Sequence, residues 1–146
     1  MLSEADSNKF LHILIAEDNV CDLELMLRML KHMGHSADSV TNGLEVIHAL
    51  QNKCYNVILM DIEMPVMNGL DATRIIRHRW RDRRIKIIAV TGRNQKDDKQ
   101  ICIEAGMDDH IAKPVVMDTL NFALNHCLSM NRDGGFNACS IKIDGL

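Results

Sequence analysis

Short apolar runs alternate with longer amphipathic stretches along most of the chain. The clearest run, VILM at residues 57–60, ends abruptly in Asp61. A short continuous apolar run of this kind is typical of a strand buried on both faces of a sheet. Between such runs, apolar residues recur every three or four positions, as they do on one face of a helix. The pattern predicts strands at residues 10–16, 35–40, 55–60, 85–90 and 109–112, and helices at about residues 20–33, 44–51, 68–80, 95–105 and 117–130.

The alternation of strands and helices indicates the fold class. A β-α unit repeated five times predicts an α/β protein with a doubly wound parallel sheet, covered by helices on both faces and joined by right-handed crossovers. Residues 10–130 then form one domain, preceded by a polar lead-in at residues 1–9 and followed by a tail or linker at residues 131–146. The helix faces that we expect to point inward include Leu44, Ile47 and Leu50 in one helix and Ala72, Ile75 and Ile76 in the next.

Composition narrows the classes of partner. A net charge of −3 over 146 residues gives no reason to expect direct binding to nucleic acid or to a membrane surface. No apolar run approaches the ~20 residues that are needed to span a bilayer. The five cysteines are odd in number and widely spaced, which predicts reduced thiols and a cytoplasmic protein.

Reactive side chains stand at the ends of four predicted strands. Glu17 and Asp18 follow the first strand, Asp61 the third, Thr91 the fourth and Lys113 the fifth. The carboxyl ends of parallel strands meet at one edge of a sheet, so we expect these side chains to converge. Close carboxylates repel one another unless a cation lies among them, and oxygen ligands suit Mg²⁺. A carboxylate can also attack phosphorus, and phosphoryl transfer depends mainly on positioning and charge neutralisation. The convergence therefore favours phosphoryl chemistry at Asp61.

The same strand ends carry motifs of a known family. The sequences LIAEDN at residues 14–19, LMDIEMPVMNG at 59–69, AVTG at 89–92 and EAGMDDHIAKP at 104–114 resemble the receiver domain of two-component response regulators and hybrid histidine kinases. The resemblance covers about residues 10–130, and residues 62–77 are most similar to receivers attached to hybrid kinases. It implies a flavodoxin-like sheet with strand order 2-1-3-4-5.

The resemblance also implies a role for each strand-end residue. Asp61 would accept a phosphoryl group from a histidine kinase or a histidine phosphotransfer protein. Mg²⁺ would be held by Asp18, by Asp61 and by the backbone carbonyl of Glu63, with Glu17 nearby. Lys113 would contact the phosphoryl group and Thr91 would swing toward it. Such a domain is a phosphoacceptor that assists its own phosphorylation and dephosphorylation rather than an enzyme, and we expect a monomer or weak homodimer. A cis peptide bond is expected between Lys113 and Pro114.

Two positions suggest adjustments to this scheme. His110 stands where the family usually has Tyr or Phe as a switch residue. Because the unperturbed pKa of histidine is ~6.5, His110 would make switching sensitive to pH. Glu63 and Arg93 flank the expected entrance for the hydrolytic water and carry opposite charges. Their pairing would tune the lifetime of the phosphorylated state.

Other functions fit the sequence less well. A phosphohydrolase with an aspartyl intermediate usually has its nucleophile after the first strand, whereas Asp61 follows the third. A receiver-like binding module that works without phosphorylation would be expected to lack Asp61, Asp18 or Lys113, and all three are present. The basic stretch at residues 74–86 is interpreted as the solvated end of a helix, where cations are favourable.

Overall fold

The structure is a computed structural model that describes residues 11–92 and 96–132. Strands and helices alternate in the predicted order, and most of their boundaries lie within about two residues of those predicted. The elements are β1 (Ile13–Ala16), α2 (Val20–His32), β2 (Ala37–Val40), α3 (Gly43–Asn52), β3 (Val57–Asp61), α4 (Gly69–Arg79), β4 (Lys86–Thr91), α5 (Lys96–Ala105), β5 (Asp109–Ala112) and α6 (Met117–Arg132). The lead-in at residues 1–9 and most of the predicted tail lie outside the described residues.

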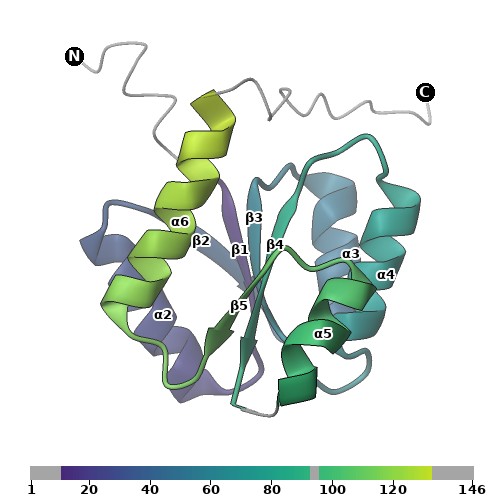
Figure 1. Ribbon diagram of the computed structural model, residues 1–146, viewed down its shortest axis with the longest axis horizontal. Helices are drawn as coiled ribbons and strands as arrows, with labels where there is room; N and C mark the ends of the chain where they lie inside the picture. Colours follow the sequence, from purple (N-terminus) through teal and green to yellow (C-terminus); the bar gives the residue numbers. More distant parts are fainter. Residues whose placement is uncertain (1–10, 93–95, 133–146) are drawn as a thin grey trace.

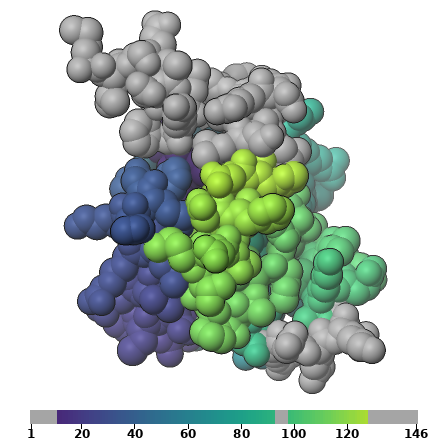
Figure 2. Space-filling model, turned by 60° about the vertical axis from the view of Figure 1, so that its left-hand side comes forward, coloured from purple at the N-terminus to yellow at the C-terminus, as the bar shows by residue number. Residues whose placement is uncertain are grey.

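The strands form one parallel sheet in the order β2-β1-β3-β4-β5, which confirms the predicted topology. Helices α2 and α6 cover one face of the sheet, and α3, α4 and α5 cover the other (Figure 1). Figure 2 brings the first of these faces forward and shows α6 beside α2. Because both faces are covered, the strands are buried along their whole length in β1 and β3.

Alternate residues of β1, β3 and β4 point into two separate apolar cores. In β3, Ile58 and Met60 face the core beneath α3, α4 and α5, whereas Val57 and Leu59 face the core beneath α2 and α6. All four side chains are fully buried. Two inward positions were predicted wrongly. The side chains of Leu44 and Ile75 are 40% and 36% exposed, because Val46 and Thr73 take the buried positions beside them.

Thr73 is an unexpected member of this buried face. Its hydroxyl donates a hydrogen bond of 2.7 Å to the carbonyl oxygen of Gly69, one helical turn earlier. A buried hydroxyl that has found a partner costs little, so a polar residue can occupy an apolar face. The hydrophobic pattern alone could not distinguish Thr73 from its solvated neighbours.

Asparagine caps begin the helices that lead away from the reactive edge of the sheet. The side chains of Asn19, Asn42 and Asn68 each accept a hydrogen bond from a backbone N–H three residues later. Gly69 follows the last of these caps, and a Cβ atom there would overlap the carbonyl oxygen of Asp61. A glycine is therefore needed for α4 to start directly against the end of β3.

Arg77 joins three segments at the opposite edge of the sheet. Its guanidinium donates hydrogen bonds of 2.8 Å to the carbonyl oxygen of Gly106 and 2.7 Å to that of Ile85, and it forms an ion pair of 2.7 Å with Asp108. In contrast, the one ion pair of Arg74 within the described residues is an exposed pair with Asp71 on its own helix. The interpretation of the basic stretch as a solvated helix end therefore holds for Arg74 and is wrong for Arg77.

The cysteines divide into two groups. Cys21, Cys102 and Cys127 are free thiols, as expected. Cys54 is disulfide-bonded, so the prediction of reduced thiols is wrong for this residue. Within the described part of the chain, none of the helices has the length and apolar character that crossing a membrane requires.

Candidate functional site

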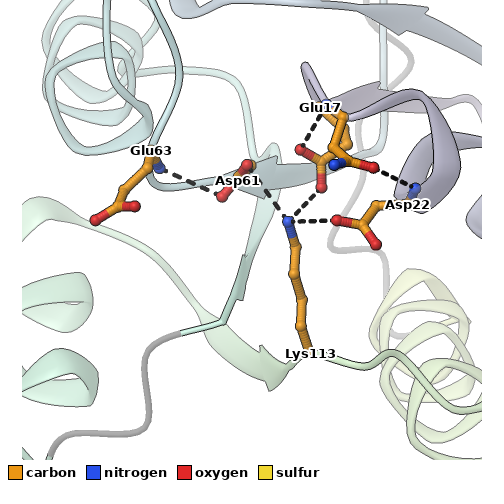
Figure 3. A network of polar contacts seen from close by, with 6 residues as sticks. Glu17, Asp22, Asp61, Glu63 and Lys113 are labelled. Carbon is orange, nitrogen blue, oxygen red and sulfur yellow. Dashed lines mark hydrogen bonds and ion pairs between the residues drawn. The ribbon is translucent and has the colours of Figure 1, made fainter.

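The carboxyl ends of β1, β3, β4 and β5 lie next to one another. Ala16 of β1 is in register with Met60, and Asp61 with Val90. Thr91, at the end of β4, is in register with Ala112. The residues that close or follow these strands therefore meet at one edge of the sheet, and Figure 3 shows Glu17, Asp61 and Lys113 pointing toward one another there.

Lys113 is the centre of this network. Its ammonium nitrogen lies 2.5 Å from Glu17 Oε1, 3.1 Å from Asp22 Oδ2 and 3.5 Å from Asp61 Oδ2. Asp22 was not predicted as part of the site. It stands in the first turn of α2, four residues after Asp18, so its position near a strand end was the available signal.

Asp61 is buried, with only 7% of its surface exposed. Its Oδ1 accepts a hydrogen bond of 3.3 Å from the backbone N–H of Glu63. Burial, together with hydrogen bonding and charge repulsion from Glu17, raises the pKa of Asp61 to about 7, although Lys113 acts in the opposite direction. A raised pKa means that the fold disfavours the ionised carboxylate unless further positive charge is supplied.

The pKa values of Glu17 and Lys113, which contact Asp61, are also shifted. Burial alone would raise the pKa of Glu17, but hydrogen bonds with Asp61 and Lys113 outweigh it and lower that pKa. Burial alone would lower the pKa of Lys113, but its contacts with Glu17 and Asp22 raise that pKa above its usual range. Glu17 and Lys113 are thus held as ions, and the unbalanced negative charge falls on Asp61.

The carboxylates at this edge fit a divalent cation. One oxygen each from Glu17, Asp18 and Asp61 lies within 4.8 Å of the others, and Asp18 is exposed to solvent. Three carboxylates and one ammonium leave an excess of negative charge, which adds to burial in raising the pKa of Asp61. A hard cation with oxygen ligands would remove that excess. A groove of about 570 Å³ is lined by residues that include Asp18, Glu63 and Asn68, so it borders the carboxylate cluster at Asp18.

The remaining predicted residues occupy different surroundings. Thr91 is buried, and its carbonyl oxygen accepts a hydrogen bond of 2.8 Å from the backbone N–H of Lys113. His110 lies on β5 opposite Ala89, and its buried Nε2 has no hydrogen-bond partner among the described residues. The side chain of Glu63 is exposed and points away from Asp61 (Figure 3). Arg93 lies outside the described residues, so its pairing with Glu63 stays a prediction.

The peptide bond that precedes Pro114 is cis, as expected.

Comparison with known proteins assigns the family. The sequence pattern of the response regulator receiver domain matches residues 13–125. The chain belongs to this family. Its similar proteins include a histidine kinase and a hybrid histidine kinase, which confirms the predicted resemblance to the receivers of hybrid kinases.

The similar curated proteins are much longer than this chain. A probable histidine kinase from Oryza sativa subsp. indica is 33% identical over 80% of the chain, which spans 15% of that protein. Hybrid signal transduction histidine kinase G of Dictyostelium discoideum is 37% identical over 82% of the chain, which spans 4% of it. Two-component system protein A of Emericella nidulans is 41% identical over 75% of the chain, which spans 16% of it.

Solved receiver domains share the fold over nearly their whole length. One is the receiver domain of a sensor histidine kinase from Pseudomonas aeruginosa, crystallised with a magnesium ion coordinated in the active site cleft. It is 34% identical, with a TM-score of 0.75 over 82% of this chain and 98% of its own. Another is the receiver domain of a Saccharomyces cerevisiae response regulator, crystallised with a histidine phosphotransfer signaling protein. It is 25% identical, with a TM-score of 0.78 over 83% of this chain and 90% of its own.

Proposed function

We propose that this receiver domain is a phosphoacceptor switch in which Asp61 takes a phosphoryl group from a phosphohistidine. The observation that carries the proposal is the placement of the buried Asp61 carboxylate between Lys113 and the backbone N–H of Glu63. The donor would be a histidine kinase or a histidine phosphotransfer protein. A similar receiver has been crystallised with such a phosphotransfer protein, which supports this class of partner.

The proposed transfer exchanges one bond to phosphorus for another. A carboxylate oxygen of Asp61 attacks the phosphorus of the phosphohistidine, and an O–P bond forms. The P–N bond breaks, its electron pair stays on the imidazole nitrogen of the donor, and the ring takes up one proton from solvent to become a neutral histidine. The product is an acyl phosphate on Asp61. Lys113 already lies 3.5 Å from Asp61 Oδ2, so its ammonium can neutralise charge on the transferred group without a long movement.

Other residues of the chain would prepare Asp61 for this step. The N–H of Glu63 holds Oδ1 and so limits rotation of the carboxylate. Glu17, Asp18 and Asp61, with the backbone carbonyl of Glu63, would hold Mg²⁺, which a similar receiver contains in its active site cleft. When bound, Mg²⁺ supplies positive charge to the phosphoryl oxygens. Bound Mg²⁺ also favours the ionised form of Asp61, which is the nucleophilic form.

The output of the switch would be a changed partner-binding surface. Thr91 is buried at the end of β4, and its backbone is tied to Lys113, so movement of either residue can be passed to the other. We assign Thr91 and His110 to this transmission and place the domain in the cytoplasm with its donor. The acceptor role of Asp61 does not depend on these two assignments.

Intact-mass measurement tests the acceptor role. The protein is incubated with acetyl phosphate, with Mg²⁺ or with a chelator. Wild type is expected to gain one phosphoryl group only with Mg²⁺, and Asp61→Asn is expected to gain none. Asp71→Asn is the matched control, because Asp71 is an exposed aspartate on α4 that pairs only within its own turn. Equal phosphorylation of wild type and Asp61→Asn contradicts the proposal. A folded wild type that takes up no phosphoryl group favours a binding module that works without phosphorylation.

A further inference from the structure

Three carboxylates surround the ammonium of Lys113, which donates hydrogen bonds to Asp22 and Asp61 and forms an ion pair with Glu17. A lysine ammonium has three N–H groups, and Lys113 has three carboxylate partners within 3.5 Å. Asp61 is the most distant of the three, and Asp22 is closer by 0.4 Å. A phosphoryl group on Asp61 therefore meets an ammonium that Glu17 and Asp22 already hold.

The three partners differ in how easily they can be released. The side chain of Glu17 is completely buried, and Asp61 is the acceptor itself, with a side chain that is 9% exposed. The side chain of Asp22 is 40% exposed, so water can replace Lys113 around its carboxylate. Asp22 also stands outside the group of carboxylates that could share a cation. Among the three, Asp22 is the one that can give up the ammonium at low cost.

The backbone holds Asp22 in place for this contact. Its N–H donates a hydrogen bond of 3.0 Å to the side chain of Asn19, which caps α2. An acidic residue in the first turn is also favoured by the helix dipole. The carboxylate is therefore presented to Lys113 by an ordered turn of α2, as Figure 3 shows.

We propose that Asp22 is a positioning residue that holds Lys113 in the resting state and competes with the phosphoryl group for it. The proposal rests on the acceptor role of Asp61. Before phosphorylation, Asp22 draws the ammonium toward α2. After phosphorylation, Asp22 and the phosphoryl oxygens compete for the same ammonium. Asp22 thus weakens the phosphorylated state, which favours return of the phosphoryl group to a donor.

The competition can be measured with beryllofluoride, a mimic of the phosphoryl group, by calorimetric titration at saturating Mg²⁺. Asp22→Asn keeps the size of the side chain and leaves the cap intact, because the cap uses the backbone N–H. It is expected to bind beryllofluoride about two- to fivefold more tightly than wild type, the upper part of the range for a partly exposed ion pair. Asp22→Glu keeps the charge and is expected to stay within about twofold of wild type.

Two controls separate a direct contact from a general effect of charge. Glu24→Gln removes an exposed charge from the same helix and is expected to leave the affinity unchanged within about twofold. The titrations are repeated in 1 M salt, where the screening length is about 3 Å. A ratio of the Asp22→Asn and wild-type affinities that persists at high salt supports a short-range contact. A gain in Glu24→Gln equal to that in Asp22→Asn, at either salt concentration, overturns the assignment.

The outcomes for wild type and variant distinguish the two proposals. If wild type binds beryllofluoride and Asp22→Asn binds it no more tightly, the assignment of Asp22 is wrong and the acceptor role stands. If wild type binds no beryllofluoride in the presence of Mg²⁺, the acceptor role fails and the role of Asp22 falls with it. Matching melting curves for the variants establish that each one is folded.

Discussion

Replacing Asp61 by Asn is expected to stabilise the metal-free protein, and to do so more strongly at pH 8 than at pH 5. Asp61 is 7% exposed and has a pKa of about 7 in the folded protein, compared with 3.8 for an unperturbed aspartate. A carboxyl whose pKa is raised by folding contributes stability that is fully present below pH 3.8 and is lost as the pH rises through about 7. Asn has nearly the same shape but never ionises, so the variant escapes this loss.

The magnitude follows from the pH interval. Between pH 5 and pH 7 the carboxyl of Asp61 is ionised in the unfolded chain but mostly protonated in the folded protein. Each pH unit in this window costs the wild type about 1.4 kcal/mol of unfolding free energy. The advantage of Asp61→Asn should therefore grow by about 2.7 kcal/mol between pH 5 and pH 8. The lowered pKa of Glu17 does not alter the expected difference between pH 5 and pH 8. The stability that ionised Glu17 contributes is lost only at pH values below this range.

Urea unfolding at several pH values, with chelator present, measures the effect. The difference in unfolding free energy between variant and wild type cancels the titration of histidines, which both proteins share. Asp71→Asn, at an exposed site, is expected to differ from wild type by less than about 0.5 kcal/mol. Addition of Mg²⁺ at pH 8 should stabilise wild type by mass action and leave Asp61→Asn almost unchanged. A difference that does not depend on pH, or a variant less stable than wild type at pH 8, contradicts the assigned electrostatics of the site.

Two further substitutions test how the fold positions the site. Gly69→Ala is expected to destabilise the protein by at least about 2 kcal/mol and to weaken Mg²⁺ binding, because the added Cβ would overlap the carbonyl oxygen of Asp61; an unchanged melting temperature and Mg²⁺ affinity would show that this close approach is unimportant. Arg77→Ala is expected to cost about 2–4 kcal/mol in urea unfolding, because it leaves two carbonyl groups and a carboxylate without their donor. Arg74→Ala, which breaks one exposed pair, should cost less than about 1 kcal/mol, and similar losses for the two variants would contradict the reasoning.

The fold could be predicted from sequence because its strands are buried on both faces. Continuous apolar runs such as residues 57–60 therefore marked the sheet, and Asn68 marked the start of a helix. The strand order itself came from the family motifs. The pattern was least reliable at helix faces, where Leu44 and Ile75 are apolar but exposed. Such positions lie at the border of the buried face of a helix, and packing against neighbouring elements decides whether they are buried or exposed.

The site was predictable only to the extent that its residues end strands. Asp61 ends β3 and Lys113 follows β5, and a parallel sheet brings the carboxyl ends of all its strands to one edge. Asp22 lies near a strand end, but its contact with Lys113 spans 91 residues of sequence, and no local pattern pairs the two. Arg77 likewise acts through contacts 29 and 31 residues away, and within its basic stretch it looked like any other surface arginine.

Locating the phosphoryl group on the chain tests the central claim most directly. The protein is incubated with Mg²⁺ and a phosphorylated histidine phosphotransfer protein, then treated with borohydride, which reduces an aspartyl phosphate to homoserine. Peptide mass spectrometry then identifies the reduced residue. The proposed function predicts homoserine at position 61 alone, and none when a chelator replaces Mg²⁺. Homoserine at Asp18 or Asp22, or a phosphoryl group recovered on a histidine of this chain, would contradict the assignment of Asp61 as the acceptor.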